Sequence, residues 1–570
     1  MQCYCKAEIC CYLLNLNTHL GGLFLLESRF WEQSLFKTVF VKKTLVSDFI
    51  PTVITCSSWR FSMPSSVYER PGSFFSLLNL GIVMTFNKSL LATVITSIAL
   101  TGCGGDSSNN NSSVVVDESP VAEAFTDNFP ADGVVLPYSV LRADLVDVST
   151  ALPFEIRNGG FGSAMTKDPA SENRFYALTD RGPNATFNTG SYGKGKKFPT
   201  PDYTPRIGLF EVSTSGEISL IKTVLLKRPD GTLITGLPNT SALGGTGETP
   251  YNADGSPVLV DGSKPYDETT NPVKLDDYGL DPEGLVALKD GSFWVSDEYG
   301  PHMVHFDADG KEIDRINAFA SDTRVTHHLP AEFAYRRANR GMEGLAITPD
   351  EKTLVGIMQS TMQLPNKSVQ NMDLTRIVTV NVEDGAVHQY LYKQEKGANS
   401  NSEIAALSAT EFLVIERDGS FLYGGPDGTE AANPSAMKHV YRIDLSTGTD
   451  IESIAASGDL VQDEDLGLTI AGNTLEQQVL ADGDWSTLSS NNIVPVEKSL
   501  VVDMVAEVNY AHDKMEGLWV INDKYLGVLN DDDFATWSTA DGDLEQKMLD
   551  TNTIDGNHLY IVPVDLSVAQ

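Results

Sequence analysis

Short apolar runs separated by polar turns recur along the chain, and the stretch 281–300 shows the pattern most clearly. Two apolar runs, 285–288 and 293–295, flank an Asp-Gly turn. Runs this short, bounded by glycine and aspartate, predict strands rather than helices, and the Asp-Gly turn predicts a hairpin. Because antiparallel strands run in opposite directions, Glu283 before the first strand and Glu298 after the second should lie at the same edge of the sheet.

This unit recurs at regular intervals along the chain. The copies start at Glu283, Glu343, Glu403 and Glu516, and a divergent early copy has Ser163 in place of the glutamate. In chain order the intervals are 120, 60, 60 and 113 residues, near multiples of 60. Three or four strands in each copy, arranged radially, predict an all-β fold of the β-propeller type. Roughly 440 residues at this period allow six or seven blades.

Long polar insertions interrupt the repeats at 182–205 and 229–280. They are too long for ordinary hairpin loops. We expect them to wall a site or to cap a blade.

Carboxylates converge in such a fold, because the first strand of every blade faces a common central channel. Like charges a few ångströms apart raise one another's pKa. A hard divalent cation with oxygen ligands relieves this repulsion, and calcium is the ion we expect. The candidate ligands are Glu283, Asp297, Glu298, Glu343, Glu403, Glu416, Glu516, Asn530, Asp531 and Asp532. The alternative is that each glutamate accepts hydrogen bonds from backbone amides and locks neighbouring blades together.

Basic side chains are scarce near these acids, so four of them stand out: Arg181, Arg340, Arg417 and Lys514. Each lies within a few residues of a motif acid. Two interpretations stay open. They form ion pairs with the neighbouring carboxylates, or they form an anion-binding rim that faces a metal-bound substrate.

Composition narrows the function classes. The 570 residues carry 41 Lys and Arg against 77 Asp and Glu, a formal charge of -36, which excludes a general affinity for nucleic acid. All six cysteines lie within the first 103 residues, so the rest of the chain has no disulfide and no thiolate metal site. No Gly-x-Ser-x-Gly motif follows residue 103, which gives little support to a serine esterase.

The N-terminal region predicts export. Residues 84–103 have a lysine, a short apolar core and small residues, the layout of a secretory signal peptide, and Leu100 to Cys103 closely resembles the lipobox of bacterial lipoproteins. We expect lipidation at Cys103, a flexible tether over 104–133 and a single domain over 134–570. Residues 1–83 are expected to be an unstructured over-extension before a true start at Met84. The predicted location is the bacterial cell envelope, with a lipid anchor in the outer membrane.

Several motifs in order resemble the bacterial family described as esterase-like activity of phytase, over residues 136–564. The motifs are Gly160-Phe161-Gly162-Ser163, Asp180-Arg181-Gly182, Asp281-Pro282-Glu283-Gly284, Ser296-Asp297-Glu298-Tyr299-Gly300, Asn339-Arg340-Gly341-Met342-Glu343-Gly344, Lys514-Met515-Glu516-Gly517 and Asn530-Asp531-Asp532-Asp533-Phe534. The resemblance implies a secreted or surface β-propeller that hydrolyses esters, phosphate esters among them, with calcium. The sequence departs from the family at Asp532, where the family more often has asparagine.

These observations lead to one main prediction and two alternatives. We expect a monomeric, calcium-dependent hydrolase of phosphate or carboxylic esters that acts on a small molecule. Calcium lowers the pKa of an attacking water, Glu283 and Glu343 are the leading catalytic candidates, and Arg181, Arg417 or Lys514 stabilises the developing negative charge. The first alternative is a non-enzymatic surface propeller that binds a ligand or a protein, with calcium as a brace. The second is a sugar-lactone hydrolase.

Overall fold

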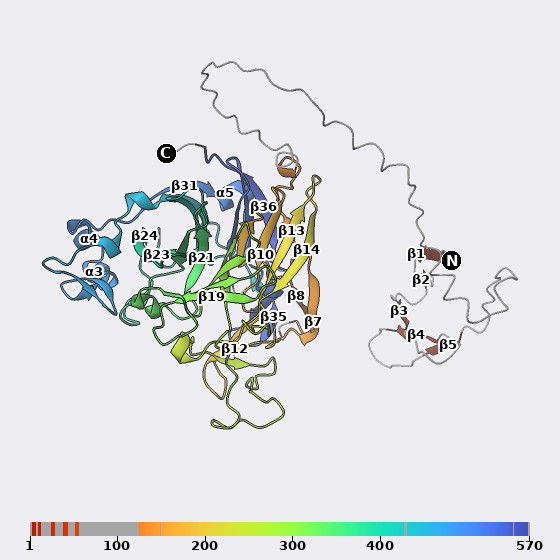
Figure 1. Ribbon diagram of the computed structural model, residues 1–570. Helices are drawn as coiled ribbons and strands as arrows, with labels where there is room; N and C mark the ends of the chain where they lie inside the picture. Colours follow the sequence, from red (N-terminus) through yellow and green to blue (C-terminus); the bar gives the residue numbers. More distant parts are fainter. Residues whose placement is uncertain are drawn as a thin grey trace, which may run out of the picture. The chain divides into compact units, whose positions relative to one another are not determined.

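The computed structural model describes residues 125–567, except 149, 427–429 and 551, together with five short strands before residue 56 (Figure 1). Between 125 and 567 the chain is mostly strands in small antiparallel sheets, with few helices. The predicted all-β class is therefore confirmed. None of the described helices is long and apolar enough to cross a membrane.

The five early strands belong to residues 1–113, a unit separate from residues 114–570. They form two small sheets, β1–β2 and β3–β4–β5. Their bounds are β1 Cys3–Lys6, β2 Ile9–Tyr12, β3 Phe24–Ser28, β4 Thr38–Lys43 and β5 Thr52–Thr55. The predicted signal peptide, the lipidation site Cys103 and most of the predicted tether lie outside the described residues.

Five sheets of four or five strands make up the main body. The first runs β9 Ala164–Lys167, β10 Arg174–Leu178, β13 Arg206–Val212 and β14 Ile218–Leu225. The second runs β16 Pro282–Ala287, β17 Phe293–Asp297, β18 His302–Phe306, β19 Glu312–Asn317 and β20 His327–His328. The third runs β21 Met342–Ile347, β22 Thr353–Met358, β23 Leu374–Asn381 and β24 Val387–Lys393.

The fourth sheet runs β25 Ser400–Ala406, β26 Glu411–Arg417, β27 Lys438–Asp444 and β31 Glu497–Asp503. The fifth runs β32 Gly517–Val520, β33 Tyr525–Leu529, β36 His558–Pro563 and β6 Val134–Val135. Its outermost strand, β6, comes from the start of the domain. The last sheet is thus completed by hydrogen bonds between the two ends of the domain.

The sheets form a closed ring. Their first strands contact one another in the order β9, β16, β21, β25, β32 and back to β9. A hydrophobic cluster lies between each pair of consecutive sheets: Leu285 packs near Leu178, for example, and Ile404 near Val355. The last such cluster joins Trp519 of the fifth sheet to Phe175 of the first. This arrangement is β-propeller-like.

Glycines allow the first strands to approach closely. A Cβ added at Gly284 would lie 2.6 Å from the backbone nitrogen of Leu345, and one at Gly344 would lie 2.6 Å from the backbone nitrogen of Ile404. Real Cβ atoms do not come this close to backbone, so a side chain at either position would push two sheets apart. The Glu-Gly pair of the repeat therefore has a packing role as well as a chemical one.

The described residues hold five sheets of this kind, fewer than the six or seven blades that the spacing suggested. The two longest intervals between motifs contain insertions rather than further blades. The first interval contains the sheet β11 Ala185–Phe187, β12 Gly195–Lys197 and β15 Thr249–Tyr251, with η1 Ser241–Leu243. The other contains η4 Leu445–Thr447, η5 Ile451–Ser453, β28 Leu460–Asp463, β29 Gly467–Ile470, β30 Asn473–Thr474, α3 Leu475–Asp482 and α4 Ser486–Ser490. An apolar strand in an insertion has the same sequence pattern as a strand in a blade. The repeat period alone therefore overestimates the number of blades.

The remaining elements sit beside the ring. Two further sheets of two strands each pair β7 with β8 and β34 with β35. Their bounds, with those of the other helices, are β7 Ser139–Val146, β8 Pro153–Asn158, η2 Ala331–Tyr335, α5 Met504–Val508, η6 Asp533–Ala535, β34 Thr536–Ser538 and β35 Leu544–Gln546. β11 contacts β34, so the first insertion meets the fifth sheet's own insertion.

Candidate active site in the central cavity

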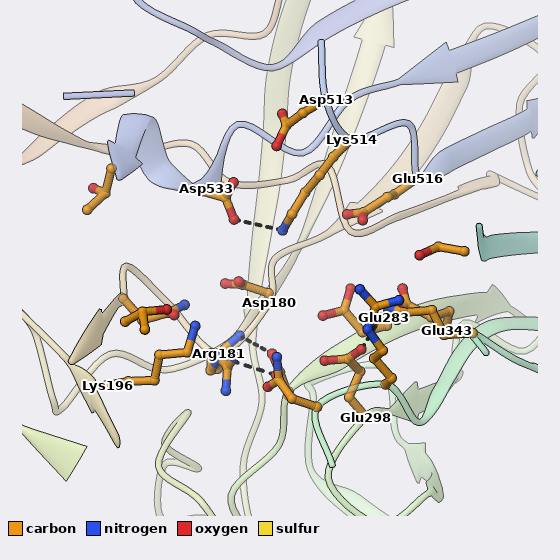
Figure 2. Close-up of a pocket in the computed structure, with 18 of the residues that line it drawn as sticks. Asp180, Arg181, Lys196, Glu283, Glu298, Glu343, Asp513, Lys514, Glu516 and Asp533 are labelled. Atoms are coloured by element: carbon orange, nitrogen blue, oxygen red, sulfur yellow. Dashed lines mark hydrogen bonds and ion pairs between the residues drawn. The ribbon is translucent and has the colours of Figure 1, made fainter. Parts of the chain in front are cut away.

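A cavity of about 330 Å³ is lined by charged residues at or next to the ends of first or second strands of all five sheets (Figure 2). Eight carboxylates and five cationic side chains line it, so it carries an excess of negative charge. The carboxylates are Asp180, Asp281, Glu283, Glu298, Glu343, Asp513, Glu516 and Asp533, and the cations are Arg181, Lys196, Arg340, Arg417 and Lys514. Histidine is absent from the described lining, so no Ser-His pair faces this cavity.

Strand register decides which motif glutamates face the cavity. In β16 and β21 the pairing skips Glu283 and Glu343, because each lies in a β-bulge next to its glycine. In β25 the skipped residue is Ser402, and Glu403 pairs with Ile415. A shift of one residue turns a side chain to the other face. Glu283 and Glu343 accordingly line the cavity, and Glu403 does not.

Glu403 has the capping role that the sequence left open. Its Oε1 accepts hydrogen bonds from the backbone amides of Ile404, at 2.9 Å, and Leu345, at 3.3 Å. The second bond reaches the first strand of the preceding sheet. Glu403 therefore holds two sheets together.

Three carboxylates gather at one wall of the cavity. One oxygen each of Asp281, Glu283 and Glu298 lies within 4.8 Å of the others. Burial, and then the charges of Glu343 and Asp281, raise the pKa of Glu283 well above its usual value. Burial also raises the pKa of Glu343, followed by Glu298. These groups stay ionised together only with a positive charge among them.

The same wall holds oxygens without a partner. Glu343 Oε2 and Gln359 Oε1 are buried and have no hydrogen-bond partner among the described residues. Gln359 Nε2 donates to Glu298 Oε1 at 2.9 Å, so its own oxygen stays available beside the carboxylates. Carboxylate and amide oxygens are the ligands that calcium prefers. The residues present therefore fit the expected ion.

Three of the predicted anion-binding residues already have carboxylate partners. Arg181 lies 3.2 Å from Asp281 and 3.3 Å from Glu248, and Arg417 pairs with Glu516. Lys514 contacts Asp531 at 2.6 Å and Asp533 at 2.7 Å. Although burial opposes it, these two aspartates raise the pKa of Lys514 well above its usual value. The ion-pair interpretation fits these three cations.

Two cations of the lining differ from the others. The side chains of Lys196 and Arg340 form no hydrogen bond or ion pair with any described residue. Burial lowers the pKa of both, and neighbouring arginines add to the effect. The sequence predicted Arg340 as an anion-binding residue. It did not predict Lys196, which lies in an insertion outside the repeated motifs.

Five of the other predicted ligands are not among the residues that line the cavity. Asp297 accepts hydrogen bonds from the backbone of Asp281, Gly300 and His302, and Asp532 from that of Gly160 and Phe534. The others likewise have local partners: Glu416 accepts from Tyr392 and Lys498, Asn530 from the His558 amide, and Asp531 pairs with Lys514. These contacts favour a structural role for Asp297, Glu416, Asn530 and Asp532. Asp531 differs, because its carboxylate also lies within 4.8 Å of those of Asp180 and Asp533, a group that could hold a metal ion.

Sequence reasoning missed several lining residues. Asp281 and Asp180 belong to the quoted motifs, and each precedes a named residue by one or two positions. Burial raises the pKa of Asp180 well above its usual value, and the charges of Asp531 and Asp281 raise it further. Gln359 directly follows β22 in the third sheet, as Glu298 directly follows β17 in the second. Comparing strand ends across the repeats could have found it.

Comparison with known proteins gives one strong match. A family model described as Phytase-like, esterase-like activity of phytase, matches residues 156–534. An "Uncharacterized secreted protein" from Arthroderma benhamiae is 28% identical over an alignment of 316 residues, with 46% of this chain and 59% of that relative covered. The alignment thus spans less than two thirds of the relative's length.

Solved structures show weaker likenesses. The PQQ-bound aldose sugar dehydrogenase from Streptomyces coelicolor is 10% identical, with 76% of this chain and 99% of that chain covered and a TM-score of 0.25. Virginiamycin B lyase from Staphylococcus aureus is 13% identical, with coverage of 62% and 95% and a TM-score of 0.21. At these TM-scores the likeness carries no conclusion about function.

Proposed function

We propose, from the premise that this chain belongs to the phytase-like family described as esterase-like activity of phytase, that it is a calcium-assisted hydrolase of phosphate or related esters. We further propose that it acts outside the cytoplasm as a monomer, held to the cell envelope through Cys103. The secreted relative supports an exported location.

One observation carries the proposal. Unpartnered carboxylate and amide oxygens line the same cavity as Arg340, a cation without a described partner. A phosphate ester needs both features, because its oxygens bind a cation and its remaining negative charge binds a guanidinium. A neutral ligand would leave the half-buried Arg340 without an ion-pair partner.

Asp281, Glu283, Glu298 and Glu343 would hold the ion. Bound there, calcium would contribute Lewis-acid chemistry, binding ester oxygens and lowering the pKa of a water. Arg340 would stabilise the negative charge that develops on the reacting group.

Glu516 is the general base in this proposal. Burial, opposed by Lys514 and Arg417, raises the pKa of Glu516 to about 7, which suits proton transfer near neutral pH. Arg417 fixes one carboxylate oxygen, and Oε2 has no hydrogen-bond partner among the described residues. Glu516 Oε2 would accept the proton of the attacking water, while the leaving alkoxide takes a proton from solvent.

Hydrolysis assays test this function. The purified protein is assayed on p-nitrophenyl phosphate, p-nitrophenyl acetate and a lactone, with calcium and with a chelator. We expect calcium-dependent turnover of the phosphate ester, and a loss of about 100-fold or more in Glu283→Gln at an unchanged melting temperature. Glu403→Gln is the matched control, because Glu403 lies outside the cavity and should leave turnover near the wild-type level.

The same assays separate the alternatives. Tight calcium binding without turnover of any substrate would contradict hydrolysis and favour a binding protein braced by calcium. Turnover of the lactone alone would favour a lactone hydrolase. A drop in melting temperature as the sole effect of Glu283→Gln would assign that residue a capping role.

A further inference from the structure

Three neighbouring lysines on the first insertion have three different surroundings. Lys194 is exposed. Lys197 is buried, where it contacts Asp543 at 3.2 Å and lies 4.6 Å from the centre of the Phe187 ring. Lys196, between them in the strand β12, lines the cavity. The insertion thus delivers one cation to the site.

Lys196 is a half-buried cation without an ion-pair partner among the described residues. Although eight carboxylates line the cavity, none lies within ion-pair distance of its ammonium among the described residues. Burial, and then the charge of Arg181, lower its pKa. The charges of Glu248, Asp281 and Asp533 act in the opposite direction, but none of these carboxylates forms an ion pair with the ammonium, which is therefore available to a bound anion.

The surroundings of Lys196 differ from the carboxylate wall. Asn184 and Thr186 of the same insertion line the cavity, as do Trp537 and Ser538 of β34. Figure 2 shows Lys196 beside Arg181 and well apart from Glu343. Amide, hydroxyl and indole groups bind the body of a polar molecule, so this side is suited to the part of a substrate that does not react.

The two unpartnered cations have different charged neighbours. The charges that act on Arg340 are those of Arg337, Arg417, Glu298 and Glu343. Those that act on Lys196 come from Arg181, Glu248, Asp281 and Asp533. An anionic group bound at Arg340 would therefore leave Lys196 without a bound anion.

We propose that Lys196 is a specificity-determining residue that binds a second anionic group of the substrate, away from the group that reacts. The inference rests on the proposed function, in which Arg340 and the acid wall bind the reacting ester. It names the substrate class as esters that carry two anionic groups. The first insertion, which contains Lys196, would bind this second anionic group.

Binding of non-hydrolysable probes tests the inference separately from catalysis. Isothermal titration calorimetry compares butylphosphonate with alkane bisphosphonates of two, four and six carbons, on the full-length protein. We expect the best bisphosphonate to bind about tenfold or more tightly than the monophosphonate, since a hydrogen bond to a charged group contributes at least this much. Lys196→Met should remove most of this preference, and Lys196→Arg should retain most of it.

Lys194→Met is the matched control, because Lys194 lies two residues away and outside the cavity; it should keep the wild-type preference. Lys196→Gln repeats the test if the methionine variant fails to fold, as judged by its melting curve. Equal affinity of the wild type for mono- and bisphosphonates, or a preference that survives Lys196→Met, would overturn the inference. Ester turnover without the bisphosphonate preference would overturn the inference alone, whereas the Lys196-dependent preference without turnover would overturn the proposed hydrolysis alone.

Discussion

At the scale of single residues, the buried carboxylate of Asp532 is electrostatically unfavourable. Its Oδ1 accepts hydrogen bonds from the amides of Gly160 and Phe534, both at 3.1 Å, and its side chain is buried. Burial, and then the charge of Asp531, raise its pKa from 3.8 to about 8. At neutral pH the residue must either carry a proton or keep an unfavourable buried charge.

Asp532→Asn should stabilise the protein at alkaline pH. A raised native pKa favours folding below pH 4, and this contribution is lost as pH rises through about 8. Asparagine keeps the accepting oxygen and removes the charge, so we expect a gain of about 1–3 kcal/mol at pH 8.5 and a smaller change at pH 5. Urea unfolding at the two pH values measures it, and a lower stability at pH 8.5 would refute the argument.

Asp533→Asn is the matched comparison, with the opposite sign. Although burial opposes it, Lys514 and Lys547 lower the pKa of Asp533. Its charge therefore stabilises the fold above the usual aspartate pKa. The variant should be less stable than wild type at pH 8.5.

The activity should have an acidic limb set by Glu516. With a pKa of about 7, Glu516 accepts a proton only above that value, so kcat/KM should rise as pH increases through 7. Glu516→Gln should lower kcat by about 10²–10⁴ and flatten the limb. A limb that persists in this variant would assign the base to another group.

At the scale of elements, the bulges in β16, β21 and β25 determine which of their glutamates line the cavity and which have a structural role. The repeat correctly located hairpins at Glu283 and Glu343 and brought both to one site. The repeat could not show that Glu403 differs from the other two. In β25 the bulge falls on Ser402, one position before the glutamate, although the sequence motif looks the same. Register depends on packing between neighbouring sheets, which no single repeat contains.

Glu403 offers a test of this division. Glu403→Ala removes the acceptor of two backbone amides, that of Ile404 in β25 and that of Leu345 in β21, at a cost of about 1–3 kcal/mol. Thermal unfolding would show the loss, while turnover per folded molecule should stay near wild type. Lost turnover at intact stability would instead return Glu403 to the catalytic set.

The insertions mark the other limit of sequence reasoning. The segment between β27 and β31 has its own hydrophobic cluster, which includes Leu468, Leu475 and Trp485. The helix α3 within it begins with a capping box at Thr474 and Gln477. Its apolar positions pack against Leu374 and Leu391 on the third sheet, a distant contact that the local pattern does not encode.

At the scale of the whole molecule, the ring is closed by residues from the start of the domain. Phe125 is fully buried and stacks on Trp519 with ring centres 5.9 Å apart. The strand β6 then pairs with β36, where Val134 lies opposite Leu559. Residues predicted to form a tether thus begin the folded domain.

Phe125→Ala should destabilise the whole ring. Removing this side chain leaves a cavity between the fifth and first sheets, with a cost of about 3–5 kcal/mol. Chemical denaturation measures the loss, and Tyr423→Ala, a truncation of an exposed aromatic, is the control. A loss below about 1 kcal/mol would show that β6 closes the ring without Phe125.

The cavity takes residues from Asp180 to Ser538, so it spans nearly the whole domain. Contacts between such distant parts of a chain form late and slowly during folding. A chain whose last sheet has not yet formed has no complete site, so a ligand cannot stabilise it. Any molecule that binds the finished cavity therefore selects fully assembled protein, and calcium bound as we propose would protect that protein from unfolding and proteolysis.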